Sequence, residues 1–183
     1  STARIQRLVN SLLDINRLES GHHIIDQNSV DPQALIRESI RDVMPAAAGR
    51  QQNIENKVTM VLPLIWVDVD MVHRVFINLL ENAIKFSKHS PHPRIEFGAS
   101  QDDHHVILWM RDNGIGFDMK YNHRIFEIFE RLHRQEDYPG TGIGLALVKK
   151  AMQRMGGQVW AYSIPGEGAT FYLQLPIMQE NLT

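Results

Sequence analysis

The chain has 183 residues, of which 43% are hydrophobic and 22% are charged, and its formal net charge is −2. This composition is typical of a folded globular protein and excludes a disordered chain. The small net charge argues against nucleic acid as a partner, and we expect no direct membrane contact. The chain has no cysteine, which excludes disulfides and thiolate metal sites. No apolar run is long enough to span a membrane.

The first helix is predicted at residues 3–20. Its apolar stripe consists of Ile5, Leu8, Val9, Leu12, Leu13, Ile15 and Leu18. Gly21 is the expected helix stop. The stripe is narrow and no companion helix follows within the next few residues, so we expect the same helix of another copy as its partner. Packing against the rest of this chain explains the pattern almost as well. Because Ser1 already stands in helical sequence, we expect a longer natural protein.

The next residues predict an alternation of strands and helices. Residues 22–30 favour a strand, and Asp31 with Pro32 starts a helix that ends at about Gly49. Further strands are predicted at 52–61, 64–68, 94–100, 105–111, 158–163 and 168–175, and further helices at about 70–87 and 142–155. This order predicts an α+β fold, a two-layer α/β sandwich in which helices cover one face of a mixed sheet.

The helix at 70–87 carries a polar arc. At about 100° per residue, one narrow side collects Arg74, Asn78, Glu81, Asn82 and Lys85, and the opposite side collects Val72, Val75, Phe76, Leu79, Ala83 and Phe86. Asparagine is unfavourable inside helices, so two of them one turn apart indicate a binding role. Amide oxygens are hard ligands for Mg²⁺, and a lysine one turn further is a donor for phosphate. For this segment alone, a solvated polar face is at least an equal alternative.

A first glycine segment, RDNGIGF (111–117), follows an apolar strand and places Asp112 at the strand end. Gly114 and Gly116 allow a ligand to approach the backbone closely. The carboxylate of Asp112 is suited to accept a hydrogen bond from an adenine amino group. A simple Asp-Asn-Gly turn is the alternative.

A second glycine segment, GTGIG (140–144), leads directly into the helical residues 145–150. Free backbone N–H groups and the dipole at a helix N-terminus favour phosphate. The segment is not a Walker loop, because no Gly-Lys-Ser/Thr follows, and the glycine spacing differs from the dinucleotide fingerprint. A flexible hinge is the less favoured alternative.

The stretch at 117–140 has weak periodicity apart from an apolar anchor around Phe126 and Phe129. A loop of this length inside a compact domain is usually functional and is often a lid. We expect Arg131 to reach the terminal phosphate of a nucleotide when this lid closes. An ordinary surface charge is the alternative.

Together these segments resemble the catalytic and ATP-binding domain of bacterial sensor histidine kinases, in the Bergerat-fold group shared with gyrase, Hsp90 and MutL proteins. HRVFINLLENAIKFS (73–87) resembles the asparagine motif, DNGIG (112–116) the first glycine motif, IFEIFER (125–131) the phenylalanine motif and GTGIGL (140–145) the second glycine motif. The four motifs occur in order with family-like spacing, and the resemblance covers about residues 22–176. The segments around them are most similar to phytochrome-like kinases.

The resemblance implies site residues in all four motifs. It implies that Asn82 ligates Mg²⁺ with support from Asn78, and that Asp112 binds the adenine amino group. The residues implied to bind nucleotide are Asn78, Asn82, Lys85, Phe86, Asp112, Gly114, Gly116, Phe117, Gly140, Thr141, Gly142, Gly144 and Leu145. Those implied to assist phosphoryl transfer are Asn78, Lys85 and Arg131.

Asn78 favours transfer over hydrolysis within this resemblance. ATP-hydrolysing relatives carry a glutamate at this position, which activates water, and an amide cannot accept the proton. Catalysis is then mostly positioning and charge neutralisation. The nearby Glu81 is a less favoured substitute base. A hydrolytic ATPase, a nucleotide-binding regulatory module and serine phosphorylation of another protein are the alternatives.

The resemblance also implies an organisation and partners. Residues 1–21 resemble the end of a dimerisation and histidine-phosphotransfer helix, 22–178 the catalytic domain, and 179–183 a tail. None of the nine histidines matches the acceptor motif, so we expect the acceptor histidine upstream and no self-phosphorylation by this chain. The implied protein is a cytoplasmic, homodimeric histidine kinase of a two-component system. Its implied partners are ATP or ADP with Mg²⁺, the upstream dimerisation domain and a cognate response regulator.

Overall fold

The structure is a computed structural model that describes residues 2–21, 24–134 and 136–179. Its elements in chain order are α1 (Thr2–Glu19), β1 (Gln27–Val30), α2 (Pro32–Ala48), β2 (Asn53–Asn56), β3 (Ile65–Asp68), α3 (Val69–Phe86), β4 (Arg94–Gln101), β5 (His105–Asp112), η1 (Met119–Tyr121), η2 (Arg124–Phe126), α4 (Gly144–Arg154), β6 (Gln158–Ile164) and β7 (Gly168–Pro176). None of the helices among these residues is both long and apolar enough to cross a bilayer.

The predicted elements are present, with differences at their ends. The strand predicted at 52–61 is only the four-residue β2, and the helix predicted from about 142 begins at Gly144. The start of the strand predicted at 22–30 falls partly on residues outside the described ranges, and so does most of the tail predicted at 179–183. The order of helices and strands follows the prediction.

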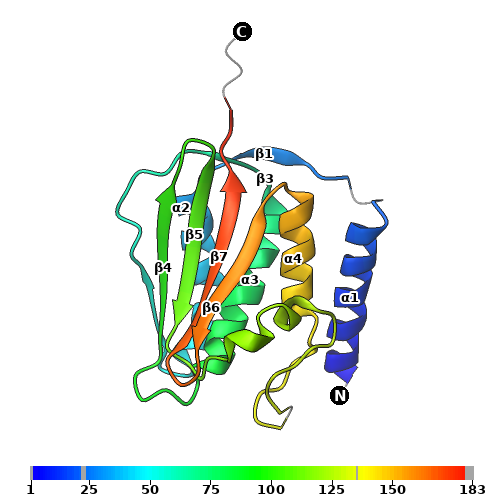
Figure 1. Cartoon of the computed structure of the whole chain (residues 1–183), viewed down its shortest axis with the longest axis vertical. Coiled ribbons are helices and arrows are strands. Elements are labelled where there is room, and N and C mark those ends of the chain that lie inside the picture. Colours follow the sequence, from blue (N-terminus) through cyan, green and yellow to red (C-terminus); the bar gives the residue numbers. More distant parts are fainter. Residues whose placement is uncertain (1, 22–23, 135, 180–183) are drawn as a thin grey trace.

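The main sheet has the strand order β2-β4-β5-β7-β6. β2 pairs with β4 in parallel, and the other neighbouring strands are antiparallel, so the sheet is mixed. In Figure 1, α2, α3 and α4 lie on one face of this sheet. The predicted two-layer α/β sandwich is therefore confirmed. A separate antiparallel pair of β1 and β3 lies at one end of the sandwich.

The orientation of α3 follows from its sequence. Asp68 starts the helix, and its side chain accepts a hydrogen bond from the Met71 N–H at 3.0 Å. The predicted apolar side is buried except for Phe86, which is only half-buried and lines the cavity instead. The Phe76 ring stacks on Phe97 of β4 with ring centroids 5.9 Å apart. Because the core holds this side, the polar arc of α3 faces the cavity described below.

Helix α1 packs against α4. The contact is a small apolar cluster of Ile15, Ile143, Ala146 and Leu147, with Leu8 and Leu12 at its edge. Asp14 of α1 also pairs with Arg74 of α3, with 2.8 Å between Oδ2 and Nη1. The side of α1 that carries Ile5, Val9 and Leu13 is exposed. Packing within the chain is therefore confirmed for one side of α1, and a second copy stays a prediction for the exposed side.

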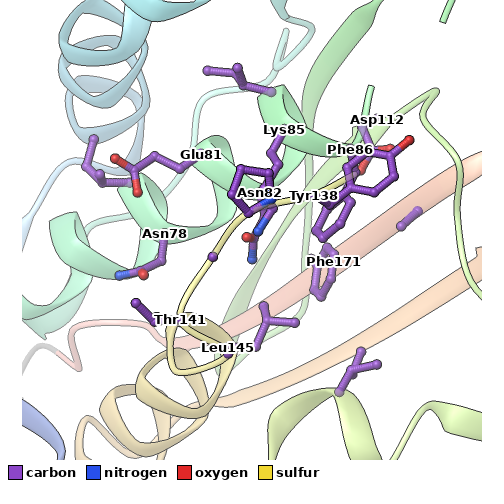
Figure 2. Close-up of a pocket in the computed structure, with 18 of the residues that line it drawn as sticks. Asn78, Glu81, Asn82, Lys85, Phe86, Asp112, Tyr138, Thr141, Leu145 and Phe171 are labelled. Carbon is purple, nitrogen blue, oxygen red and sulfur yellow. The ribbon is translucent and has the colours of Figure 1, made fainter. Parts of the chain in front are cut away.

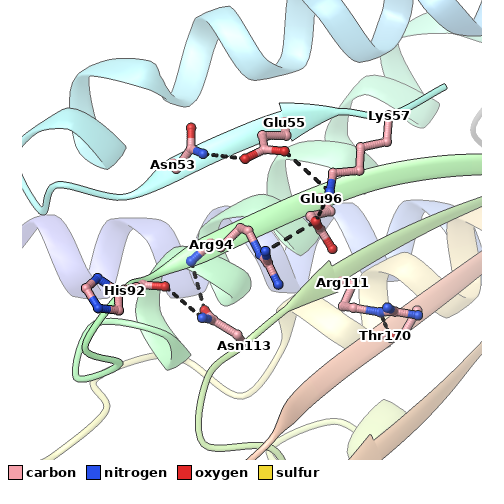
Figure 3. A network of polar contacts seen from close by, with 9 residues as sticks. All are labelled: Asn53, Glu55, Lys57, His92, Arg94, Glu96, Arg111, Asn113 and Thr170. Carbon is pink, nitrogen blue, oxygen red and sulfur yellow. Dashed lines mark hydrogen bonds and ion pairs between the residues drawn. The ribbon is translucent and has the colours of Figure 1, made fainter. Parts of the chain in front are cut away.

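A network of polar contacts joins β4 to its neighbours (Figure 3). The buried Glu96 forms two ion pairs. Its Oε1 atom lies 2.5 Å from Lys57 Nζ and 3.5 Å from Arg94 Nε. The hydrogen bond from Lys57 is the main reason that the pKa of Glu96 is lowered. The Asn113 side chain accepts from the Arg94 N–H at 2.8 Å and donates to the His92 carbonyl at 2.7 Å. These bonds fix the first glycine motif to the start of β4.

The uncovered face of the sheet carries a row of aromatic side chains. Trp160, Tyr172 and Trp109 are cross-strand neighbours on β6, β7 and β5. The rings of Trp160 and Tyr172 are stacked, with centroids 5.3 Å and planes 5° apart. Cross-strand aromatic pairs of this kind each stabilise a sheet by roughly 0.2–1 kcal/mol.

Candidate functional site

The polar side of α3, the end of β5 and the segment before α4 enclose a cavity of about 1060 Å³ (Figure 2). This is at the upper end of the range of small-molecule sites. Every predicted site residue except Gly114 lines it. These lining residues are Asn78, Asn82, Lys85, Phe86, Asp112, Gly116, Phe117, Arg131, Gly140, Thr141, Gly142, Gly144 and Leu145. Four sequence motifs therefore meet at one cavity.

Asp112 lies at the end of the central strand β5. In the sheet register it stands between Ile95 of β4 and Ala169 of β7. Its carboxylate is buried and accepts a hydrogen bond from the Gly114 N–H at 2.9 Å. Burial raises the pKa of Asp112 to about 6, although backbone hydrogen bonds from Gly114 and Ala169 oppose this rise. A buried carboxylate that is ionised at neutral pH is suited to bind the N–H donors of a ligand.

Gly114 itself does not line the cavity. A Cβ at this position would lie 2.4 Å from the carbonyl oxygen of Phe86, so only glycine fits. The N–H of Ile115 donates to the same Phe86 carbonyl at 3.1 Å. The structure thus gives Gly114 a supporting position, in which it joins the first glycine motif to the end of α3 and orients Asp112.

The two asparagines of α3 lie toward the other end of the cavity (Figure 2). Asn78 Nδ2 donates to the Arg74 carbonyl at 2.8 Å, one turn earlier in the helix. The Asn78 Oδ1 atom then lies close to Gly144, where a Cβ would approach it to 2.9 Å. Glu81 is exposed, and in Figure 2 its side chain points away from Asn82.

Lys85 stands between the two ends of the cavity. Burial lowers the pKa of Lys85, and the positive charge of Arg131 lowers it further. Its Nζ lies 4.4 Å from the centroid of the Phe86 ring. An anion bound near Lys85 and Arg131 would relieve the repulsion between the two cations.

The second glycine motif crosses the phenylalanine motif at Gly142. The Phe129 N–H donates to the Gly142 carbonyl at 2.8 Å. Gly142 has a left-handed φ of +73°, and a Cβ there would lie 3.1 Å from Phe129 Cα, so the crossing requires glycine. Helix α4 begins two residues later, and Ile143 provides no side-chain cap, which leaves its first N–H groups for a ligand.

The crossing at Gly142 closes a loop, and we call its described residues, 130–134 and 136–141, the lid; in Figure 1 it lies below α4 and beside the N-terminal end of α1. Arg131 braces the lid from inside. Its Nη1 donates to the Gly140 carbonyl and its Nη2 to the Tyr138 carbonyl, both at 2.7 Å. Contact between Arg131 and a terminal phosphate stays a prediction. It requires that the Arg131 guanidinium give up its hydrogen bonds to Gly140 and Tyr138 or donate to the phosphate as well.

Several lining residues were missed by the sequence reasoning. They include His133 and Tyr138 of the lid, Phe171 of β7 and Asp14 of α1. Burial lowers the pKa of His133, although a hydrogen bond with the Gly116 backbone opposes this. The only sequence signal for Tyr138 was an aromatic residue immediately before Pro-Gly, and Asp14 gave no signal because α1 is far from the motifs in sequence.

Comparisons with known proteins agree with this geometry. The family model of the histidine kinase-, DNA gyrase B-, and HSP90-like ATPase matches residues 67–179. The chain is 39% identical over 136 residues to the phytochrome-like protein Cph1 of Synechocystis sp., covering 72% of this chain and 18% of that protein. The chain spans about a fifth of the length of the curated relatives it matches.

Solved structures of sensor kinases have the same fold. The crystal structure of full-length ShkA in complex with AMPPNP matches with a TM-score of 0.84 and 28% identity, over 97% of this chain and 37% of that one. The mycobacterial sensor histidine kinase MprB matches with a TM-score of 0.73 and 27% identity, over 85% of this chain and 100% of that one.

Proposed function

The chain belongs to the family of histidine kinase-, DNA gyrase B- and HSP90-like ATPases, and we propose that it binds Mg-ATP and donates the γ-phosphate to a histidine in two-component signal transduction. The observation that carries the proposal is the composition of the cavity. A buried carboxylate lies at one end, and amides, cations and an uncapped helix start lie toward the other. These groups complement the amino group of adenine and the charge of a triphosphate.

At the base end, we assign recognition of adenine to Asp112. The ionised carboxylate accepts a hydrogen bond from the exocyclic amino group, and the apolar side chains of Phe86, Phe117 and Leu145 surround the base. A hydrogen bond to a charged acceptor is worth about 1.5–3 kcal/mol. This end therefore sets the nucleotide specificity.

A magnesium ion fits the other end only together with the nucleotide. Asn82 offers an amide oxygen, which is a hard neutral ligand, and Asn78 stands one turn earlier. Across residues 2–21, 24–134 and 136–179, no group of three histidine or carboxylate side chains is placed to hold a metal by itself. The ion supplies charge neutralisation on the phosphates when it is bound.

The residues around the phosphates favour transfer over hydrolysis. The amide of Asn78 cannot take a proton from water, and its Nδ2 already donates to the Arg74 backbone. Glu81 also lines the cavity, but it is exposed and its side chain points away from Asn82 (Figure 2), so we assign it no role as a general base. Lys85, Arg131 and the start of α4 then stabilise the charge of the transferred phosphoryl group while an incoming histidine acts as the nucleophile.

For the whole protein, we propose a homodimeric cytoplasmic kinase. Residues 1–21 form the end of a dimerisation domain whose upstream part carries the acceptor histidine, and residues 22–178 form the catalytic domain. The exposed apolar side of α1, with Ile5, Val9 and Leu13, supports contact with a second copy. The phosphoryl group passes from the histidine to a cognate response regulator.

Isothermal titration calorimetry tests nucleotide binding by the intact chain. We expect Mg-ATP and Mg-ADP to bind more tightly than the same nucleotides in EDTA. Asn82→Ala removes this dependence on magnesium, whereas Asn28→Ala, an exposed asparagine of β1, leaves it unchanged. Absence of binding by the unchanged chain contradicts the proposal.

Labelling with γ-³²P-ATP tests transfer. The chain alone should remain unlabelled, and the chain extended by its natural upstream segment should form an acid-labile, base-stable phosphoprotein. An acid-stable product would indicate phosphorylation of serine or threonine instead. Steady release of phosphate that Glu81→Gln abolishes would indicate a hydrolytic ATPase.

A further inference from the structure

Three aromatic rings meet at the base end of the cavity. Phe86 comes from α3, and His133 and Tyr138 come from the lid. The ring centroids are 5.3 Å apart for Phe86 and Tyr138, and 5.6 Å apart for His133 with each of the other two. All three residues line the same cavity as Asp112, and Figure 2 shows Tyr138 next to Phe86 on the side of Asp112.

The burial of Tyr138 is unusual for its place in the chain. Its neighbours Asp137 and Pro139 are exposed, whereas Tyr138 is only 9% exposed. A large ring that turns inward from an irregular surface loop covers apolar surface of the cavity that water would otherwise reach.

Contacts within and next to the lid set the position of the Tyr138 ring. The Arg131 side chain donates to the Tyr138 carbonyl, and the Tyr138 N–H donates to the Arg134 carbonyl at 3.0 Å. Lys88 Nζ lies 4.5 Å from the centroid of its ring. Phe86, in contrast, belongs to the last turn of α3, a regular helix whose other side is buried in the core. The two rings therefore belong to one rigid and one adjustable element.

We propose that Tyr138 is a second base-stacking residue, and that a purine binds between its ring and that of Phe86 with its amino group on Asp112. The inference rests on the proposed function, because it names a further residue of the same nucleotide site. The rings are now tilted by 37°, so the base requires them to separate and to become more nearly parallel. The lid supplies this movement because its described residues, 130–134 and 136–141, form no helix or strand.

A residue that stacks on the base and a residue that acts on the phosphates change the affinities of different ligands. Stacking on a base contributes to every ligand that carries the base and is worth about 1–3 kcal/mol by substitution. A residue that acts only through Arg131 affects the triphosphate. Comparing ligands that lack either part separates the two roles.

The experiment measures the affinities of adenosine, Mg-ADP, a nonhydrolysable Mg-ATP analogue and Mg-tripolyphosphate by calorimetry or competition. We expect Tyr138→Leu to weaken the three adenine ligands by a similar factor of about tenfold and to leave tripolyphosphate unchanged. Tyr138→Phe, which keeps the ring, should bind all four like the unchanged chain. His89→Leu is the matched control, because His89 touches the Tyr138 ring edge-on at 6.1 Å but does not line the cavity.

Three outcomes overturn the inference. The first is unchanged adenosine affinity in Tyr138→Leu while the unchanged chain binds Mg-ATP, which leaves the proposed function standing. The second is a loss confined to tripolyphosphate and the triphosphate. The third is failure of the unchanged chain to bind any adenine ligand, which also removes the proposed function. Urea unfolding of each variant verifies folding, and Tyr138→Met, whose unbranched side chain adapts better to an irregular space, replaces Tyr138→Leu if that variant unfolds.

Discussion

The two ends of the cavity are built from different kinds of structure. At the base end, Asp112 lies in the central strand between two paired neighbours, and Phe86 belongs to a helix whose other side is buried in the core. At the phosphate end, the second glycine motif is held by two hydrogen bonds to its carbonyl groups, one from the Phe129 N–H to Gly142 and one from the Arg131 side chain to Gly140. Buried apolar packing makes the first end rigid, while the second can rearrange at lower cost. The difference suggests that Asp112 and Phe86 form a fixed side of the base site, whereas the lid and the phosphate contacts are adjustable.

The largest expected effect comes from breaking the rigid end. Asp112→Asn should lower the affinities for adenosine, Mg-ADP and Mg-ATP by a common factor of about a hundredfold, because all three share the bond to the carboxylate. Calorimetry measures the three affinities. Asp118→Asn, an exposed carboxylate that starts η1, should leave them unchanged. A loss seen for Mg-ATP alone would contradict the division of the cavity into two ends.

The same substitution should stabilise the protein above pH 6. The pKa of Asp112 is raised from 3.8 to about 6, so its contribution to stability is fully present below pH 3.8 and is lost as the pH rises through 6. Asparagine carries no charge to bury, so at pH 8 Asp112→Asn should raise the free energy of unfolding by about 2 kcal/mol. Urea unfolding of both proteins at pH 4 and pH 8 measures this, and an equal difference at both values would exclude ionisation as the cause.

A smaller effect is expected from the adjustable end. Gly142→Ala places a side chain on a left-handed residue beside Phe129, at a cost of about 1–2 kcal/mol. We expect about a tenfold loss of Mg-ATP affinity and little change for adenosine. Gly156→Ala is the control, because Gly156 has a similar φ of +75° at the end of α4 and open space around it. Equal losses for ATP and adenosine would mean that the two ends are not independent.

The smallest expected effect concerns α1. The Asp14 carboxylate lines the cavity and pairs with Arg74. Asp14→Asn removes a negative charge and frees the arginine, so Mg-ATP affinity should increase about two- to threefold at low salt and less at high salt. Adenosine should bind as before. Glu19 is the control, because it belongs to the same helix as Asp14 but does not line the cavity. Glu19→Gln breaks its ion pair with Lys150 of α4 and should change neither affinity.

The sequence was sufficient wherever a short pattern reports a local environment. The polar arc and the buried side of α3 could be predicted because helical periodicity maps directly onto faces. The two-layer fold and the resemblance to sensor histidine kinases, including the phytochrome-like ones, are confirmed. Likewise, Asp112 and Gly142 were selected from motifs that place them at the end of a strand and before a helix.

The lid and the position of α1 could not be predicted in the same way. Tyr138 is buried because Arg131 and Lys88 hold the lid in one arrangement, and these contacts have no periodic signature. Gly114 carries the same sequence signal as Gly116, but only the latter lines the cavity, because the carbonyl of Phe86 stands in front of the former. Such differences depend on long-range packing, which residue spacing does not specify.

The aromatic row on the uncovered sheet face has a practical consequence for spectroscopy. The three tryptophans of the chain, Trp66, Trp109 and Trp160, do not line the cavity. The stacked pair of Trp160 and Tyr172 holds a fixed mutual geometry on β6 and β7, and near-ultraviolet circular dichroism is lost when such packing loosens. The intensity of this near-ultraviolet band therefore reports whether the sheet around Trp160 and Tyr172 keeps its packing. A variant that loses ligand but keeps the band has a damaged site on an intact scaffold.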